Sequence, residues 1–284
     1  MKVLVTGVTG QLGFDVMREL KTRNIDACGA TRQEMPLTDG AAADAFVRKV
    51  HPDVVIHCAA YTAVDRAEDE PALCREINAN AVARLAQSCA AMDATLLYIS
   101  TDYVFAGQGD CFYEPNDAKG PRNVYGQTKL AGELAVQAAL QKYFIVRISW
   151  VFGIHGKNFI RTMLNLAKTH DALTVVADQV GSPTYTADLA RLLVDMAASR
   201  KYGVYHATNE GTCSWAELAA EVFRQRGLKV QVTPVGSAAY PVKAVRPQNS
   251  RLSKTCLDAA GFSRLPAWQD AVRRYLAELA QIGE

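Results

Sequence analysis

Short apolar runs alternate with amphipathic segments through the first half of the chain. Apolar residues recur at helical spacing in residues 11–23, where Leu12, Val16 and Leu20 share one face. Further helices are expected at about 40–50, 71–92 and 123–140, and the apolar runs predict strands at 2–6, 25–30, 53–59, 95–100 and 144–149. Strands that alternate with helices indicate a parallel sheet that is covered on both faces.

This alternation predicts an α/β fold with a Rossmann-type, doubly wound parallel sheet and right-handed crossovers. Beyond Trp150 the rhythm becomes irregular. Helices are expected near 157–169, 187–199, 214–227 and 267–281, strands near 173–176 and 203–207, and a stretch rich in Pro, Ser and Ala at 233–247. We therefore expect a Rossmann domain at 1–150 and a smaller, irregular domain at 151–284, which lies over the carboxyl ends of the strands and sends segments back to the first domain.

Composition narrows the class of protein. The chain has 284 residues and is 49% hydrophobic, so it is large and apolar enough to bury a core. Its formal net charge is only +2, which gives no strong electrostatic attraction to nucleic acid or membrane. It shows no signal peptide and no apolar stretch near ~20 residues, and its seven cysteines lack CxxC spacing. The five histidines form no ligand cluster. We expect a cytoplasmic protein without a catalytic metal.

Three glycines follow the first predicted strand in "KVLVTGVTGQLGFDVMREL", residues 2–20. A strand-to-helix turn leaves the first helical amides unpaired, and a phosphate there also meets the positive end of the helix dipole. Gly7 suits the tight turn, Gly10 allows close approach to a pyrophosphate, and Gly13 allows the helix to pack on the strand. We expect a dinucleotide site that also includes Gln11 and Leu12.

The end of the second strand, "GATRQEM" at 29–35, bears on the type of cofactor. NAD-binding proteins usually place an acid there for the ribose 2′-hydroxyl, whereas NADP-binding proteins place an arginine nearby. Thr31 and Arg32 stand where that acid would be, and Glu34 lies two residues further on. The sequence favours NADPH, with Arg32 on the 2′-phosphate, and leaves NADH as the alternative.

Candidate chemistry lies in "STDYVF" (100–105) and "NVYGQTKLAGE" (123–133). Tyr125 and Lys129 are four residues apart and share a helix face. A neighbouring ammonium stabilises a phenolate, so we expect the pKa of Tyr125 to fall toward neutrality, which suits proton transfer at a carbonyl. The fourth strand ends with Ser100, Thr101, Asp102 and Tyr103, and a hydroxyl there would hydrogen-bond the reacting carbonyl oxygen.

These features together resemble the extended short-chain dehydrogenase/reductase superfamily, and finer motifs are similar to those of its dTDP-4-dehydrorhamnose reductase family. The finer motifs are the two segments above, "CAAYTAVDRAE" (58–68), "RISWVFG" (147–153), "NF" (158–159), "DQVGSPTYTADLA" (178–190) and "RPQNSRLS" (246–253). The resemblance implies an oxidoreductase that uses NADPH to reduce the C4 keto group of dTDP-6-deoxy-L-lyxo-4-hexulose, which gives dTDP-L-rhamnose in the last step of its biosynthesis.

The resemblance also implies roles for individual residues. Tyr125 would protonate the alkoxide, Lys129 would lower the Tyr125 pKa and bind the nicotinamide ribose, and Thr101 would complete the triad. Residues 1–150 would bind NADP(H) and residues 151–284 mainly the dTDP-sugar, in a monomer or homodimer. The cofactor would also contact Ala59, Ala60 and Tyr61, and the substrate would contact Thr62, Val64, Thr101, Asp102, Tyr103, Trp150, Asn158, Arg246 and Asn249.

Two departures from the family pattern bear on these roles. Pro36 occupies the place of an acid that often faces the adenine, so Asp39 or the backbone of Leu37 would take over that contact. Some members form dimers through magnesium; Asp15 could be one ligand, but Ala187 and Arg191 fall where further acids are expected. We therefore predict no metal.

Other functions stay open. A sugar-nucleotide 4,6-dehydratase is disfavoured because Tyr103 follows Asp102 where that enzyme has a second acid. A reductase of a related dTDP-4-keto-6-deoxyhexose would carry the same triad. A non-catalytic NADP-binding regulatory subunit, of the kind that accompanies one methionine adenosyltransferase, would not need the triad.

Overall fold

The computed structural model describes residues 1–283, and its centre is a parallel sheet of six strands. The strands are β1 (Lys2–Thr6), β2 (Asp26–Ala30), β3 (Val54–His57), β4 (Thr95–Thr101), β5 (Tyr143–Ile148) and β10 (Gly203–His206). They lie in the order β10-β5-β4-β3-β1-β2. The predicted Rossmann-type, doubly wound fold class is confirmed.

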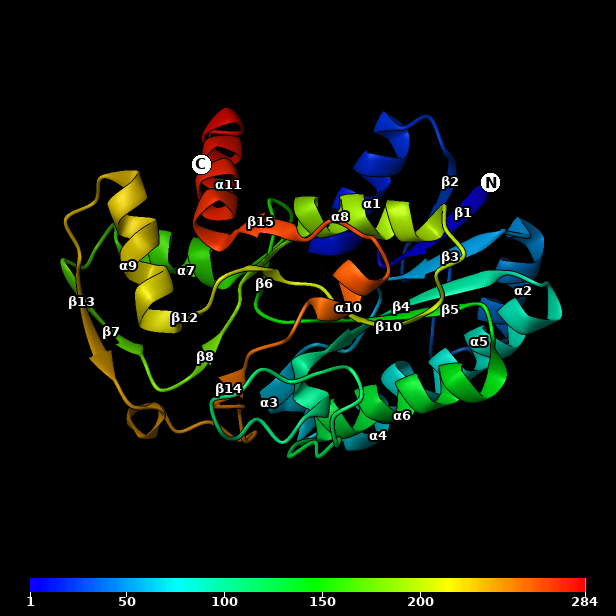
Figure 1. Ribbon diagram of the computed structural model, residues 1–284, viewed down its shortest axis with the longest axis horizontal. Helices are drawn as coiled ribbons and strands as arrows, with labels where there is room; N and C mark the ends of the chain where they lie inside the picture. Colours follow the sequence, from blue (N-terminus) through cyan, green and yellow to red (C-terminus); the bar gives the residue numbers. More distant parts are fainter. Residues whose placement is uncertain (284) are drawn as a thin grey trace.

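Helices cover both faces of the sheet because alternate strand residues are apolar on each side. Val3 and Val5 of β1 pack with α1 (Gln11–Thr22) and α8 (Thr186–Ala197), whereas Leu4 packs with α2 (Gly40–Val50), α5 (Ala81–Ala91) and α6 (Val124–Ala139). In Figure 1 the sheet lies between α1 and α8 on one side and α5 and α6 on the other. Thus two elements from the second half of the chain complete the Rossmann part: β10 adds an edge strand to the sheet, and α8 covers one of its faces beside α1.

The strand order places a switch point between β1 and β3. From β1 the chain moves outward to β2 on one side, and it then returns to β3 on the other side. Open α/β sheets bind ligands outside the carboxyl ends of the strands at such a point. The turn after β1 and the segment after β3 therefore face a common crevice.

The helix expected at 71–92 has an irregular centre. It consists of α4 (Pro71–Arg75), a π-helical turn (Glu76–Asn80) and α5 (Ala81–Ala91). Single π turns often occur at functional sites, because the extra residue redirects side chains. The amphipathic spacing predicted the extent of the helix but not this turn.

A smaller lobe follows β5 and has its own core, formed by residues such as Phe152, Val222 and Tyr275. Figure 1 shows it at the end of the molecule that carries α7, α9 and α11. Its helices are α7 (Phe159–Leu166), α9 (Trp215–Arg226) and α11 (Trp268–Gln281), and α10 (Thr255–Ala259) lies near β10. The remaining short helix, α3 (Val64–Ala67), lies after β3.

Short strands form small sheets outside the central one. The pairs are β6 (Val151–Phe152) with β9 (Thr184–Tyr185), β7 (Ala172–Val176) with β13 (Gln231–Val235), and β11 (Asn209–Glu210) with β15 (Leu265–Ala267). A further sheet has the order β12 (Cys213–Ser214), β8 (Val180–Gly181), β14 (Asn249–Ser250). The sequence did not predict β13, because Pro234 argues against a central strand; in this two-stranded sheet an edge position tolerates it.

Among residues 1–283, no helix combines the length and apolar character that crossing a membrane requires.

Candidate active site

The turn after β1 depends on two of its three glycines for its shape. Gly7 has φ +70°, and a Cβ there would lie 2.8 Å from the backbone of Ala59. A Cβ on Gly13 would lie 2.3 Å from the carbonyl oxygen of Gly7. On Gly10 the nearest atom would be 3.3 Å away, so the fold itself constrains Gly10 least. Gly10 is free to serve an approaching ligand.

Helix α1 begins without any group that would satisfy its first amides. Gly10 provides no side-chain cap, and the first turn contains no acidic residue. The amide hydrogens and the positive end of the dipole therefore remain available to an anion. Gln11 faces the other lobe, since its Oε1 accepts hydrogen bonds from the Gly153 amide (2.9 Å) and from Asn158 Nδ2 (3.1 Å).

One cavity of about 830 Å³ opens at the switch point and brings most predicted site residues together. Its floor is the glycine turn, one wall is the segment after β3, and the other is the end of β4 with the start of α6. The predicted residues along it are Gly7, Gly10, Gln11, Leu12, Gly13, Arg32, Leu37, Ala59, Ala60, Tyr61, Thr62, Val64, Thr101, Asp102, Tyr103, Tyr125, Lys129 and Trp150.

Arg32 lies exposed at the end of this cavity that follows β2. Glu34, the nearby acid, is engaged within its own turn: its Oε2 accepts from the amide and the hydroxyl of Thr31, at 2.9 and 2.7 Å. Those hydrogen bonds lower the pKa of Glu34. The charge at this position that faces the cavity is therefore positive.

The three proposed catalytic side chains converge at the carboxyl end of β4. Asn123 caps α6 by accepting from the Gly126 amide at 2.8 Å, which begins the helix so that Tyr125 and Lys129 face the sheet. The Thr101 hydroxyl lies beside that of Tyr125, whose pKa it lowers. Lys129 is 2% exposed, and its Nζ donates to the Ile99 carbonyl at 2.7 Å. A phenol, a hydroxyl and an amine thus share one wall.

Burial sets the ionisation of these groups. Burial raises the pKa of Tyr125, the neighbouring Thr101 hydroxyl opposes that rise, and the charge of Asp102 adds to it. Burial also lowers the pKa of Lys129 to about 7, against the attraction of Glu133. The expected fall of the Tyr125 pKa is therefore wrong for the protein groups alone, because desolvation of the phenolate is the largest effect on this group and raises its pKa. Tyr125 is a neutral phenol, which suits a proton donor.

Asp102 and Tyr103 follow Thr101 in a 3₁₀ turn. Asp102 is 4% exposed, and both of its carboxylate oxygens are occupied. Oδ1 accepts from the Thr101 hydroxyl at 2.9 Å, and Oδ2 accepts from the Ser250 hydroxyl at 2.5 Å. Tyr103 lies edge-on to Tyr125, with ring centroids 5.4 Å apart, and the charge of the nearby Arg246 lowers its pKa against the effect of burial.

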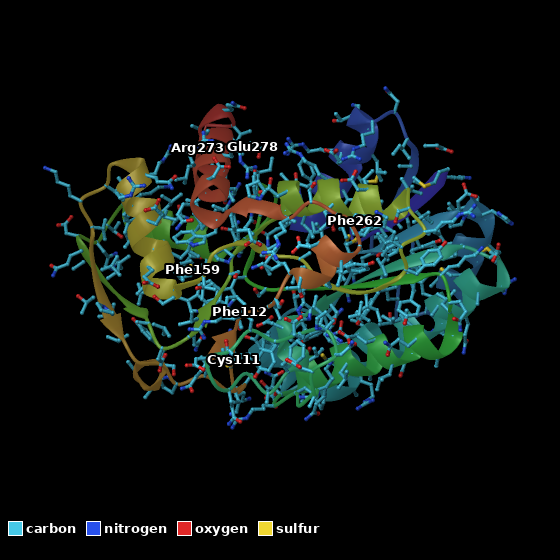
Figure 2. The ribbon with its side chains drawn as sticks, viewed as in Figure 1. Cys111, Phe112, Phe159, Phe262, Arg273 and Glu278 are labelled. Carbon is cyan, nitrogen blue, oxygen red and sulfur yellow. The ribbon has the colours of Figure 1, made fainter. Side chains whose placement is uncertain are left out.

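A second cavity, of about 860 Å³, adjoins the first at Tyr103 and Trp150. Trp150 has φ +50°, which is uncommon for a large side chain, and its ring stacks on Trp215 at 3.7 Å. A Cβ on Gly181 would lie 3.0 Å from that ring, so only glycine gives it room. Phe159, labelled in Figure 2, packs against Trp215 at 4.7 Å and lines this cavity.

Four predicted residues lie outside the first cavity. Arg246 lines the second cavity and pairs with Asp65 at 2.5 Å. Asp39 caps α2 by accepting from the Ala42 amide at 3.0 Å, whereas Leu37 does line the crevice. Asn158 caps α7 and donates to the Gly153 carbonyl at 2.9 Å.

The fourth, Asn249, is 2% exposed and donates to the Cys111 carbonyl at 2.8 Å. Asn158 and Asn249 line neither cavity. Their amides hold loops together, so the structure gives them a supporting position beside the site.

Sequence reasoning missed three residues of this region. Asn78, in the π turn, accepts from the Tyr61 amide at 2.8 Å and donates to the Tyr61 carbonyl at 3.0 Å, which fixes the wall after β3. Nothing in its local sequence marks this role. Ser250 lies within "RPQNSRLS", a motif that already carried the family resemblance, whereas Trp215 carried no signal.

In the described part of the chain, no three His, Cys, Asp or Glu residues form a group suited to a metal ion. Asp15 is buried; its carboxylate accepts from Thr186 at 2.5 Å and from Arg18 at 2.9 Å. The predicted absence of a metal stays a prediction.

Comparison with known proteins agrees with the motifs. The family model "RmlD substrate binding domain" matches residues 1–281. The dTDP-4-dehydrorhamnose reductase of Streptomyces griseus is 43% identical over 276 residues, which cover 95% of this chain and 91% of that protein.

Two solved structures show the same fold at similar identity. A dTDP-4-dehydrorhamnose reductase from Clostridium acetobutylicum has a TM-score of 0.96 and 40% identity, and the match covers 99% of this chain and 100% of that one. The dTDP-4-dehydrorhamnose reductase from Bacillus anthracis in complex with NADP has a TM-score of 0.95 and 39% identity, covering 98% and 100%. The predicted family is thereby confirmed: the chain belongs to the RmlD substrate binding domain family, which includes the dTDP-4-dehydrorhamnose reductases.

Proposed function

We propose that this protein uses NADPH to reduce the C4 keto group of dTDP-6-deoxy-L-lyxo-4-hexulose, which yields dTDP-L-rhamnose. The observation that carries the proposal is the convergence of Thr101, Tyr125 and Lys129 in the cavity that also contains the glycine turn. One cavity can thus hold a dinucleotide and a carbonyl side by side. The family membership supports the same reaction.

The cofactor supplies the hydride, and the side chains supply the rest. Tyr125, neutral because of its burial, donates its proton to the oxygen that gains charge at C4. The Thr101 hydroxyl lies beside the same C4 oxygen. Lys129 is positioned by the Ile99 carbonyl to bind the nicotinamide ribose. Orientation of the two reactants can lower the barrier by ~7–11 kcal/mol, and proton donation adds a factor of ~10²–10⁴.

The fit of the dinucleotide rests on three features of this structure. Gly10 leaves space at the start of α1, the first amides of α1 lack a capping side chain, and Arg32 faces the far end of the cavity. Because Glu34 is engaged by Thr31, Arg32 is the group we assign to the 2′-phosphate. This favours NADPH over NADH, and the NADP complex of the Bacillus anthracis relative supports it.

The nucleotide half of the substrate suits the second cavity. Its aromatic rings offer stacking faces, and Arg246 offers a guanidinium for a diphosphate. The sugar would then lie near Trp150 and Tyr103, where the two cavities meet. On this proposal residues 1–150 bind NADPH, on a sheet that α8 and β10 complete, and the rest of the chain binds mainly the sugar nucleotide.

An absorbance assay tests the function. Purified protein with NADPH and the dTDP-4-keto sugar should lose absorbance at the nicotinamide band, and a panel of dTDP-4-keto-6-deoxyhexoses should show which one is preferred. Faster turnover of another member of the panel would reassign the substrate. Tight NADP binding without turnover of any member would favour the regulatory subunit.

A further inference from the structure

Gln11 joins the glycine turn, where we place the cofactor phosphates, to the smaller lobe. It is the first residue of α1, and its Oε1 accepts from the Gly153 amide at 2.9 Å and from Asn158 Nδ2 at 3.1 Å. Gly153 follows β6 and Asn158 precedes α7, so both donors belong to the smaller lobe. One side chain at the start of α1 therefore holds two points of that lobe.

Asn158 connects this contact to the second cavity. Its Oδ1 accepts from the Arg161 amide at 3.0 Å, which caps the start of α7. Three side chains of α7 line the second cavity: Phe159, Met163 and Leu166. Asn158 itself lines neither cavity. Its place between α1 and α7 therefore gives it a role that needs no contact with a ligand.

The loop at 153–158 is also packed closely against α1. A Cβ on Gly153 would overlap the Thr186 hydroxyl at the start of α8, so only glycine fits there. Three residues beyond Gln11, the ring of Phe14 stacks on that of His155, with centroids 4.7 Å apart. Packing as well as hydrogen bonds therefore holds this loop against the first turn of α1.

The orientation of the Gln11 carboxamide leaves its Nε2 available to a ligand. A backbone amide can only donate, so the atom that faces Gly153 must be the oxygen. Among residues 1–283 no group accepts from Nε2, and Gln11 is half-buried where it lines the first cavity. Phosphate oxygens at this helix start are acceptors. A dinucleotide there would engage the same carboxamide that holds the smaller lobe.

We propose that Gln11 is a positioning residue that couples the two cavities, so that the cofactor in the first and the nucleotide of the substrate in the second bind cooperatively. The inference rests on the proposed function and deepens it. A bound cofactor orders the carboxamide, and with it the Gly153 amide and the cap of α7. The second ligand then meets a cavity wall that is already ordered, and it loses less conformational entropy on binding.

Titration of one ligand in the presence of the other measures this coupling. The ratio to determine is the Kd of dTDP alone divided by its Kd with saturating NADP⁺, both from isothermal titration. Because dTDP lacks the sugar that would meet the nicotinamide, direct contact between the two ligands contributes little. The wild-type ratio should be about five or more, and titration of NADP⁺ with and without dTDP must give the same ratio. A ratio of one would overturn the inference.

Gln11→Met keeps the length of the side chain and removes both hydrogen bonds to the smaller lobe. The ratio should then fall close to one. Gln225→Met is the matched control, because Gln225 is a half-buried glutamine of α9 that donates to the Gln269 carbonyl at 2.9 Å within the smaller lobe. It should keep the wild-type ratio. A wild-type ratio in Gln11→Met, or an equal loss in both variants, would contradict the proposed coupling.

Asn158→Ser tests the connection through α7. Serine is a good N-cap, so α7 should begin as before, whereas the donor to Gln11 Oε1 is lost. Because the Gly153 amide still donates to Gln11, the ratio should fall only part of the way toward one. A ratio equal to that of wild type would show that Asn158 does not connect the two cavities.

Comparison of binding with turnover separates this inference from the proposed function. A ratio of five or more that Gln11→Met abolishes, without turnover of any dTDP-4-keto sugar, would refute the reductase function and leave the coupling intact. Turnover of the dTDP-4-keto sugar by a wild-type protein whose ratio is one would refute the inference alone.

Discussion

Tyr125 shows how far a residue's chemistry depends on where the fold puts it. The spacing to Lys129 placed both on one helix face, and the structure agrees. The spacing could not show that burial would raise the pKa of Tyr125 and lower that of Lys129. Desolvation is set by β3, β4 and the turn after β4, none of which is local to α6. The same is true of Asp102, whose Ser250 partner lies 148 residues away.

Removal of the Tyr125 hydroxyl tests the proton donor. Tyr125→Phe should lower kcat by ~10²–10⁴, since the phenol supplies the proton, while the Kd for NADPH changes little. Stopped-flow turnover and fluorescence titration of NADPH measure the two quantities. Near-normal turnover in the variant would remove Tyr125 from the reaction.

Arg32 can be tested against the choice of cofactor. Arg32→Ala should weaken NADPH binding about 10- to 100-fold, as loss of charge-assisted hydrogen bonds to a phosphate would, and should affect NADH little. Arg48→Ala, which removes an exposed arginine of α2, is the matched control. Isothermal titration with both cofactors measures the effect, and an equal loss for NADH would show that Arg32 does not read the 2′-phosphate.

Among the helices and strands, those of the central sheet were predicted closely, because the helices are amphipathic and most of the strands are short apolar runs that alternate with them. Periodicity failed where local preference and fold disagree. Strand β13 was not predicted because it contains Pro234, which disfavours a strand. The π turn at Glu76–Asn80 was not predicted because the spacing of apolar residues does not distinguish it from an α-helix. The buried ion pair of Glu133 and Arg147, 2.7 Å apart, joins α6 to β5. The spacing of apolar residues did not predict this pair either.

In the glycine turn, Gly13 is needed for folding, whereas Gly10 is needed for ligand binding. Gly13→Ala should lower the free energy of unfolding by about 1–3 kcal/mol, because its Cβ would overlap the Gly7 carbonyl. Gly10→Ala should fold nearly normally and lose NADPH affinity, because the methyl group would occupy the space of the pyrophosphate. Chemical denaturation and NADPH titration together measure both variants; the opposite pattern would contradict these assignments.

At the scale of the whole molecule, the segment 236–247 connects the smaller lobe to the Rossmann part. Ser237 donates to Asp178 at 2.8 Å, and at the other end Asn123 donates to the Val245 carbonyl at 2.8 Å. Arg246 lies within this connection, paired with Asp65 and facing the second cavity. The sequence motif "RPQNSRLS" predicted a role for Arg246 but could not show which element it would meet.

Arg246→Ala tests whether this connection recognises the diphosphate. The KM for the dTDP-sugar should rise about 10- to 100-fold, while the Kd for NADPH changes little, because the two cavities are distinct. Arg246→Lys should recover only part of the loss, since an ammonium cannot form the bidentate bonds of a guanidinium. Equal effects on both ligands would point to a general loss of structure.

In the proposed reaction, hydride moves to C4 of the sugar beside the Tyr125 phenol. The most direct measurement is NMR of the product formed from dTDP-6-deoxy-L-lyxo-4-hexulose and NADPH that carries deuterium at both hydrogen positions of nicotinamide C4. We expect deuterium at C4 of dTDP-L-rhamnose, in the configuration of that sugar. A product without deuterium at C4, or with the opposite configuration there, would contradict it.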